Sequence, residues 1–279
     1  MKHRIITIVC CLLLASAAQA QKKTLEILHT NDTHSCIYPL NKNLTDTMLA
    51  GRGGFIRRIA MLDEQRRRNP DLLLFDSGDF CQGSAYFTMF KGDVEADLMN
   101  LMHYDAGTIG NHEFDFGLEN MARVFRRLNF PIVCANLDFT GTPVEGIVKP
   151  YVIIRRGDVK IGVFGLSPQP EGLVFKGNYE GVRYLDPADC ARQMADRLRN
   201  DEKCDVVVCL SHLGWFADPT LGDQQVIRST RNIDLVLGGH THTYMPAMEL
   251  VPNADGRLIG DDQNGKHGIF IGRILLDLE

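Results

Sequence analysis

The sequence has no basic tract, no internal repeat and no low-complexity linker, and only 8% of its residues are aromatic. Beyond its first 20 residues it also has no apolar run that approaches the ~20 residues of a membrane-spanning helix. These absences exclude a collagen, a coiled coil and a disordered low-complexity chain. The sequence contains 44% hydrophobic and 23% charged residues, which is typical of a globular protein. Its formal net charge of −5 is not that of a protein that binds nucleic acid or an anionic membrane surface.

The first 20 residues match a secretory signal peptide. Two basic residues precede an apolar run over 5–15, and the segment closes on Ala-Gln-Ala at position 20. We therefore predict a signal peptide over 1–20, one domain over 21–279 and a periplasmic or secreted location. An uncleaved membrane tether is the alternative, whereas a lipoprotein anchor is not expected because Cys10 and Cys11 lie inside the apolar run. A length of 279 residues does not fit a large catalytic domain together with a large specificity domain.

Cleavage after Ala20 would leave 259 residues and, by removing two basic residues, change the formal net charge from −5 to −7. A protein this acidic needs something other than surface lysines to neutralise a phosphate. Cleavage would also lower the number of cysteines from eight to six. An even number permits disulfides in an exported protein, although a domain of this size does not need them. Cys134 and Cys209 lie in apolar, strand-like runs typical of buried free thiols. The sequence therefore leaves open which of the six cysteines, if any, form disulfides.

Short apolar runs alternate with helix-length amphipathic stretches, which indicates an α/β protein. Strands are predicted over Leu25–Leu28, Leu72–Phe75, Ile132–Cys134, Tyr151–Ile154, Lys160–Phe164, Val206–Leu210, Leu235–Leu237 and Ile269–Leu276. Helices are predicted over Phe55–Arg68, Val94–Leu101, Leu118–Leu128, Ala188–Arg199 and Asp223–Ser229. Asp186 and Pro187 form a start signal for the fourth helix. The polar, Gly-rich stretch Pro246–Gly268 is interpreted as a surface excursion, and the pattern alone favours a doubly wound sheet.

Polar residues gather just after the predicted strands, at the sheet edge where α/β proteins bind ligands. The first strand leads into Asp32 and His34, which share one face of an extended segment. The second leads into Asp79, and the preceding glycine lets its backbone approach the edge closely. Asp76, on the same segment, fits an Asx turn or a helix cap better.

The segment Gly110-Asn111-His112-Glu113-Phe114-Asp115 places an amide, an imidazole and a carboxylate in a turn before a helix. A carboxylate one helical turn from His112 orients an imidazolium and raises its pKa, as expected of a general acid. The alternative interpretation is a surface pair of His112 and Asp115.

His212 follows a buried strand, and His240 and His242 follow a Gly-Gly hinge at alternate positions. With Asp32, His34, Asp79 and Asn111 these make seven candidate ligands, too many for one tetrahedral ion. They suit two divalent ions about 3.5–4 Å apart with one bridging carboxylate. Imidazole and oxygen ligands without a thiolate favour Zn, Mn, Fe or Co. Two such ions clamp a phosphoryl oxygen, activate a bridging water as hydroxide, and neutralise phosphate on an acidic protein.

The sequence resembles the calcineurin-like metallophosphoesterases, which share five ordered motifs. Here those motifs are Asp32-x-His34, Gly78-Asp79, Gly110-Asn111-His112-Glu113, His212 and Gly239-His240-x-His242. Three longer strings are similar to the secreted 5′-nucleotidase / UDP-sugar hydrolase branch: His29-Thr30-Asn31-Asp32-Thr33-His34, Gly110-Asn111-His112-Glu113-Phe114-Asp115 and Ala135-Asn136-Leu137. The resemblance implies a metallophosphoesterase sandwich of two mixed β-sheets flanked by helices, in place of the doubly wound sheet.

The resemblance also implies roles. One ion would be held by Asp32, His34 and His242, and the other by Asn111, His212 and His240, with Asp79 bridging the two. His112, oriented by Asp115, would stabilise the transition state and assist the leaving group. The implied reaction is hydrolysis of phosphomonoesters, 5′-nucleotides first among them, outside the cytoplasm.

Members of that branch carry a second, C-terminal domain with the nucleotide-binding aromatic stack and phosphate-binding arginines, and no residue up to Glu279 matches those roles. One alternative is therefore a catalytic subunit that needs a separate chain with the nucleotide-binding domain. Others are a 2′,3′-cyclic nucleotide phosphodiesterase or a thiosulfate-ester hydrolase, which use much the same motifs. A metal-binding protein without activity is the non-enzyme alternative, although the intact His112 and Asp115 argue against it.

Overall fold

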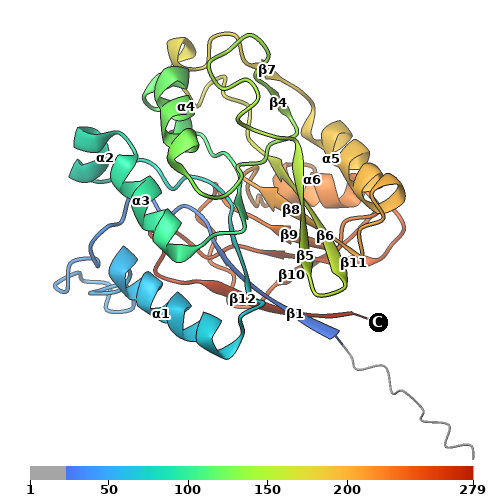
Figure 1. Ribbon diagram of the computed structural model, residues 1–279, viewed down its shortest axis with the longest axis horizontal. Helices are drawn as coiled ribbons and strands as arrows, with labels where there is room; N and C mark the ends of the chain where they lie inside the picture. The colour runs from blue at the N-terminus through green and yellow to red at the C-terminus, as the bar shows by residue number, and fades with distance from the viewer. Residues whose placement is uncertain (1–22, 279) are drawn as a thin grey trace, which may run out of the picture.

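The computed structural model describes residues 23–278, so the predicted signal peptide over 1–20 lies outside the described residues. Two sheets form the centre of the protein (Figure 1). The four-stranded sheet has the order β12 (Gly272–Leu278), β1 (Lys23–Thr30), β2 (Leu73–Asp76) and β3 (Ala106–Gly107). The six-stranded sheet has the order β10 (Glu249–Pro252), β11 (Leu258–Asp262), β9 (Leu235–Leu237), β8 (Val206–Ser211), β6 (Val159–Leu166) and β5 (Tyr151–Arg156). β4 (Leu137–Asp138) and β7 (Arg183–Tyr184) pair separately.

Both sheets are mixed. β1, β2 and β3 run parallel, as do β11, β9, β8 and β6. The strands β12, β10 and β5 join antiparallel at the edges. The doubly wound sheet favoured by the alternating pattern is therefore wrong, because that pattern does not reveal how the strands are divided between sheets. The sandwich implied by the family resemblance is confirmed.

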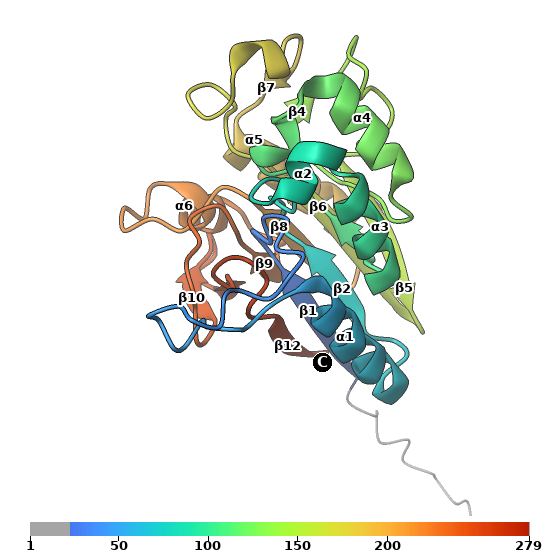
Figure 2. The same ribbon diagram turned by 90° about the vertical axis from the view of Figure 1, so that its left-hand side faces the viewer.

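The two sheets pack face to face, and helices cover their outer faces (Figures 1 and 2). Apolar side chains between the sheets include Ile27, Phe75, Val208 and Leu237. On the four-stranded side lie α1 (Phe55–Arg68), α3 (Asp93–Met102) and α4 (Gly117–Arg127), and on the six-stranded side lie α5 (Pro187–Asp196) and α6 (Gly222–Ser229). Strands buried on both faces explain the near-continuous apolar runs in the sequence.

Local signals in the sequence placed most helices well. The helix over Phe55–Arg68 has the predicted bounds, and the other four predicted helices differ at their ends. At the start of α5, the Asp186 side chain accepts a hydrogen bond of 2.8 Å from the Asp189 backbone nitrogen, as its capping role predicts. The six-residue helix α2 (Ala85–Phe90) was not predicted, and the predicted strand Ile132–Cys134 forms only isolated bridges.

The stretch Pro246–Gly268 is not the surface excursion that its composition suggested. It contains β10 and β11, which complete the six-stranded sheet. Ile259 is buried in the outer core of that sheet, and Asp261 and Gln263 are fully buried. The polar composition misled because several of these polar side chains form hydrogen bonds inside the protein rather than with water.

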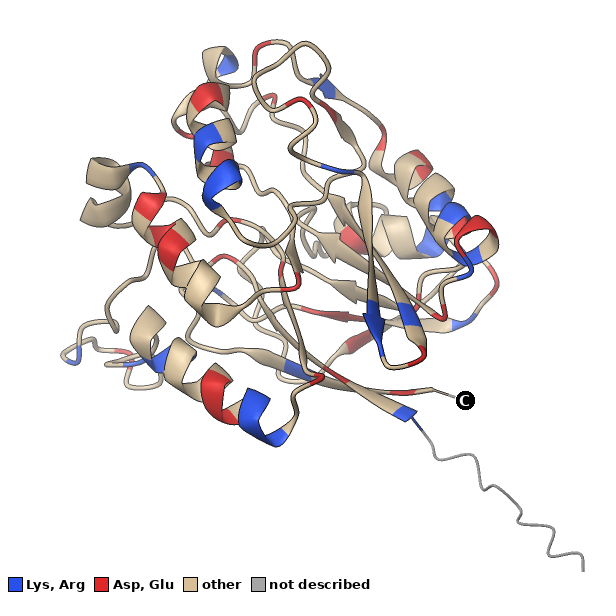
Figure 3. Cartoon of the chain, in the orientation of Figure 1, with Lys and Arg blue, Asp and Glu red and all other residues tan. Residues whose placement is uncertain are grey.

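Basic residues are spread over helices and strands, among them α1, α4, α5, β5 and β6, rather than gathered in one continuous tract (Figure 3). All six cysteines of the described residues are free thiols. Cys134 and Cys209 are buried, as predicted. Within residues 23–278 no helix has the length and apolar character needed to cross a bilayer.

Candidate metal centre

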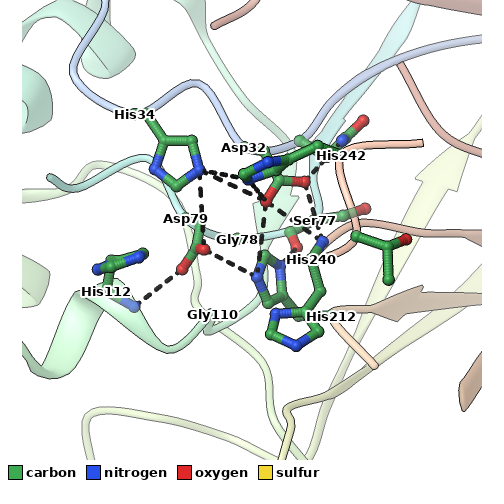
Figure 4. A network of polar contacts seen from close by, with 12 residues as sticks. Asp32, His34, Ser77, Gly78, Asp79, Gly110, His112, His212, His240 and His242 are labelled. Atoms are coloured by element: carbon green, nitrogen blue, oxygen red, sulfur yellow. Dashed lines mark hydrogen bonds and ion pairs between the residues drawn. The ribbon is translucent and has the colours of Figure 1, made fainter. Parts of the chain in front are cut away.

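The candidate ligands come from both sheets and meet at one edge of the sandwich (Figure 4). The four-stranded sheet supplies Asp32 and His34 after β1, Asp79 after β2 and Asn111 after β3. The six-stranded sheet supplies His212 after β8, with His240 and His242 after β9. Because these strands are parallel within each sheet, their carboxyl ends lie at the same edge.

One group of three candidate ligands consists of Asp32, His34 and His242, whose ligand atoms all lie within 4.8 Å of one another. Asp32 Oδ1 is 3.7 Å from His34 Nε2 and 3.5 Å from His242 Nε2. The two imidazole nitrogens are 2.9 Å apart. These three residues are the set that the family resemblance assigns to one ion.

A second group consists of Asp79, His212 and His240. His212 Nε2 lies 3.1 Å from Asp79 Oδ2 and 3.8 Å from Asp32 Oδ1. Asp79 Oδ2 is also 4.0 Å from His34 Nε2, so this carboxylate lies between the two groups. Asn111 is next to this group, because the following backbone nitrogen, of His112, donates to Asp79 Oδ1 at 2.9 Å.

One polar atom of the candidate ligands, Oδ1 of Asn111, is buried and has no hydrogen-bond partner within the described residues. Nε2 of His212 is buried too, and it faces the carboxylates of Asp79 and Asp32. His212 Nδ1 donates to the Ser77 carbonyl at 2.6 Å, so Nε2 is the ring nitrogen that faces the candidate centre. His34 is oriented in the same way by the Cys81 carbonyl at 3.3 Å. Carbonyls commonly orient metal-binding histidines, and buried polar atoms without partners are costly, so these residues fit a cation.

The charges at the edge favour a cation as well. Burial lowers the pKa of His34 and of His240 to about 4, which keeps both rings neutral at pH 7. Burial raises the pKa of Asp32 to about 6, whereas the charge of His212 overcomes the effect of burial on Asp79 and lowers its pKa. Despite burial, the two carboxylates raise the pKa of His212 to about 10. Their negative potential would stabilise a divalent ion in place of that proton.

The backbone at the edge is strained. Five of the seven candidate ligands have a positive φ: Asp32 (48°), His34 (44°), Asp79 (56°), His240 (73°) and His242 (55°). Non-glycine residues rarely adopt this left-handed conformation, and each instance costs about 1–3 kcal/mol. Such strain persists only where the surrounding structure enforces it, and it is common at functional sites.

His112 and Asp115 form the pair predicted from their spacing. His112 Nδ1 lies 3.1 and 3.2 Å from the two carboxylate oxygens of Asp115. Burial alone would lower the pKa of His112, but the hydrogen bond to Asp115 and the charge of Asp79 raise it. Because Asp115 holds Nδ1, Nε2 is the ring atom available to a substrate. A third group of clustered ligand atoms consists of His34, Asp79 and His112, so the His112 ring lies against the candidate centre. Asp115 belongs to none of the three groups.

Glu113 is a residue of the site that the sequence reasoning quoted but gave no role. Its carboxylate is buried and accepts hydrogen bonds from the backbone nitrogens of Asp79 (3.0 Å), Cys81 (3.1 Å) and Gly110 (2.6 Å). It therefore joins the loops after β2 and β3 and orients Asp79. The only signal in the sequence was its place beside His112 in a motif, because its partners in the loop after β2 lie more than 30 residues earlier.

Asn31 and Asn264 form a chain of hydrogen bonds that ends on the Asp32 carboxylate. Asn31 Nδ2 donates to Asp32 Oδ2 at 2.7 Å, and the Asn264 backbone nitrogen donates to Asn31 Oδ1 at 2.9 Å. Asn264 lies in the stretch that was expected to be a surface excursion. No local pattern could place it there, because its partner is more than 230 residues earlier in the chain.

Comparison with known proteins agrees with this geometry. A model of the calcineurin-like phosphoesterase family matches residues 25–244, a range that includes every candidate ligand. The chain therefore belongs to the calcineurin-like phosphoesterase family. This membership confirms the family and the enzyme class, a hydrolase of phosphoester bonds, that the motifs indicated.

The chain is similar to 5′-nucleotidases and related nucleotide phosphoesterases. Snake venom 5′-nucleotidase of Gloydius brevicauda is 31% identical over 282 residues, covering 94% of this chain and 46% of the relative. A trifunctional nucleotide phosphoesterase of Bacillus subtilis is 29% identical over 282 residues, covering 90% of this chain and 18% of the relative. The structure of a 5′-nucleotidase precursor from Thermus thermophilus is similar, with a TM-score of 0.81 and 28% identity. The match covers 91% of this chain and 51% of that chain. The chain thus spans about half the length of these relatives or less.

Proposed function

We propose that this protein is an exported phosphomonoesterase that uses two divalent metal ions and acts on 5′-nucleotides. The observation that carries the proposal is the pair of three-residue groups, with Asp79 between them and His112 beside them. The nucleotide substrate is supported by the 5′-nucleotidase relatives. Export is supported by the leader-like sequence over 1–20.

Each residue has a role in this proposal. Asp32, His34 and His242 would hold one ion, and Asn111, His212 and His240 the other, with Asp79 shared by both. Ions held there would supply Lewis-acid chemistry, polarising the phosphoryl oxygens and lowering the pKa of a nearby water.

His112 acts on the other side of the phosphorus atom. With Nδ1 held by Asp115 and its pKa raised, the ring carries a proton on Nε2 that it donates to the leaving oxygen. The backbone hydrogen bond from His112 to Asp79 Oδ1 fixes the distance between this acid and the candidate metal centre. The acid His112 and the candidate ligand Asn111 therefore act from one turn.

The test uses the purified mature protein after dialysis against a chelator. We expect mass spectrometry of the reloaded protein to find about two Mn or Zn ions per chain. We also expect phosphate release from AMP and from an aryl phosphate to depend on the added metal. Absence of phosphate release from every nucleotide and aryl phosphate, with no change in His112→Ala, would refute the proposal in favour of an inactive metal-binding protein.

A substrate panel separates the remaining enzyme alternatives. It would include a 2′,3′-cyclic nucleotide and a thiosulfate ester besides AMP. If either is hydrolysed faster than AMP, the phosphodiesterase or the thiosulfate-ester hydrolase replaces the nucleotidase.

The partner-chain alternative predicts a protein that is active but unselective when isolated. A separate chain with the nucleotide-binding domain would then raise kcat/KM for nucleotides and leave that for a small alkyl phosphate unchanged. Strong nucleotide selectivity of the isolated protein would contradict this alternative.

A further inference from the structure

A cavity of about 410 Å³ adjoins the candidate metal centre and has no role in the proposed chemistry. His34 forms one wall of it, and the same ring carries Nε2 at the metal centre. Tyr38, Tyr86 and His267 also line it. A cavity of this volume is within the range of small-molecule sites. A group held here would therefore be continuous with a phosphate at the metal centre.

The two tyrosines form an aromatic wall. Their ring centroids are 5.9 Å apart at an angle of 49°, and their hydroxyl oxygens are 3.2 Å apart. Phe90 extends the wall, with its ring stacked on Tyr86 at 6.4 Å. Tyr38 is 65% exposed, an unusual position for a large ring that no neighbouring element covers. Aromatic faces left open beside a reaction centre are available to stack on a planar ligand.

Hydrogen bonds hold this wall at a fixed place relative to His34. Ser35, the residue after His34, lies 2.5 Å by its Oγ from Ser84 Oγ and also donates to the buried Glu95. Ser84 in turn caps α2, accepting from the backbone nitrogen of Tyr86 at 3.1 Å. The chain that carries a metal-ligand candidate and the helix that carries an aromatic ring are thus joined by side chains. A preformed site of this kind loses little entropy when it binds a ligand.

The loop that carries Tyr38 is also anchored. The Phe55 backbone nitrogen donates to the Ile37 carbonyl at 3.0 Å, and Cys36 Sγ donates to the Tyr38 carbonyl at 3.2 Å. The main chain on both sides of the ring is therefore fixed before any ligand arrives.

We propose that this cavity binds the leaving group of the substrate, and that Tyr38 and Tyr86 select leaving groups that carry a planar aromatic ring. The inference rests on the proposed function. The cavity shares His34 with the centre that would hold the phosphate, so the leaving group is its natural occupant. Selection of an aromatic leaving group would then reside, at least in part, in this chain.

The experiment compares three substrates of the metal-loaded full chain: AMP, an aryl phosphate and glycerol 3-phosphate, which has no ring. In Tyr38→Ala/Tyr86→Ala we expect kcat/KM for AMP to fall about tenfold, equivalent to about 1.4 kcal/mol, and kcat/KM for glycerol 3-phosphate to stay within twofold. An equal loss with the aryl phosphate means that any aromatic ring is recognised, and a loss confined to AMP means that a nucleobase is. Tyr38→Phe/Tyr86→Phe keeps both rings and should retain the preference for AMP.

A second measurement does not depend on turnover. Calorimetry with adenosine and the metal-free protein should detect binding in the wild type and in the Phe variant, and binding about tenfold weaker in the Ala variant. Thermal unfolding checks that the Ala variant is folded; if it is not, the single variant Tyr38→Ala, at the more exposed ring, takes its place.

Two outcomes would overturn the inference. In the first, the ratio of kcat/KM for AMP to that for glycerol 3-phosphate is the same in the wild type and the Ala variant. In the second, Phe116→Ala lowers that ratio instead, which would place the leaving group in the neighbouring cavity of about 490 Å³ beside Asp115. Both outcomes require an active enzyme, so they are distinct from failure of the proposed phosphatase activity, in which no substrate releases phosphate.

Discussion

The two halves of the candidate centre are held in different ways. In the half from the four-stranded sheet, a buried carboxylate, Glu113, accepts three backbone hydrogen bonds behind Asp79. In the half from the six-stranded sheet, a buried carboxylate, Asp223, accepts from the side chains of Ser211 and Gln263, the first of which precedes His212. Backbone donors have no rotamers to change, whereas side-chain donors can reorient. The first half is therefore the rigid framework and the second half is more adaptable.

Other contacts support this asymmetry. The imidazoles of the six-stranded half depend on the other half for their orientation: His212 donates to the Ser77 carbonyl at 2.6 Å, and the His240 backbone nitrogen donates to Asp32 Oδ2 at 3.0 Å. His242 is the most exposed of the candidate ligands, with 36% of its side chain accessible. Damage to the framework should thus spread to both ion sites, while damage to the other half should stay local.

The largest effect is expected from Asp79→Ala, because this carboxylate lies between the two groups of ligands. Phosphate release should fall to background, and mass spectrometry should find fewer than two ions per chain even at saturating metal. Asp158→Ala, at a side chain that is 92% exposed, serves as the control and should change neither quantity. Wild-type metal content in Asp79→Ala would contradict a bridging role.

The next effect separates chemistry from metal binding within the framework half. His112→Ala removes the proposed general acid and should lower kcat by about 10²–10⁴-fold. Its metal content should stay that of the wild type, because the ring is oriented by Asp115 rather than by a ligand of the centre. A substrate with a very acidic leaving group should recover most of the rate, since it needs no proton. Loss of metal together with activity would show that His112 is a ligand instead.

A third prediction tests the framework itself. Glu113→Gln replaces one acceptor oxygen by an amide group, so at least one of three buried backbone donors loses its partner. We expect stability to fall by about 1–3 kcal/mol in urea unfolding and metal affinity to fall about 10–100-fold. The exposed Glu119→Gln, on α4, is the matched control. Unchanged affinity in Glu113→Gln would mean that the loops hold Asp79 without this carboxylate.

How far the sequence could predict this asymmetry depends on the range of each interaction. Spacing placed His112 one turn before Asp115, and strand ends located the histidines, because both are local patterns. Glu113 had no assigned role, since two of its three partners are backbone nitrogens of the loop after β2, more than 30 residues earlier. The positive φ of Asp32 and of His240 has no local signal, because neither position carries the glycine that usually adopts this conformation. Asp261 was placed in a surface stretch because polarity is normally a sign of exposure, and here it is not.

The smallest effect is expected in the adaptable half. Burial raises the pKa of Asp223 to about 7 although Ser211 and Gln263 oppose the shift, and burial with the charge of Asp223 raises the pKa of Asp261 well above its usual range. A carboxyl group whose pKa is raised by folding stabilises the folded state fully below about pH 4, and this contribution is lost as pH rises through the folded pKa.

From these groups the metal-free wild type should therefore lose stability between about pH 4 and pH 7, and Asp223→Asn should lose about 1 kcal/mol less over the same interval in urea unfolding. Asp218→Asn removes the same charge at an exposed position and should follow the wild type. Because Asn can still accept from Ser211, metal affinity of the Asp223 variant should fall less than that of Glu113→Gln. Equal losses of affinity in these two variants would show that both halves of the centre are equally rigid.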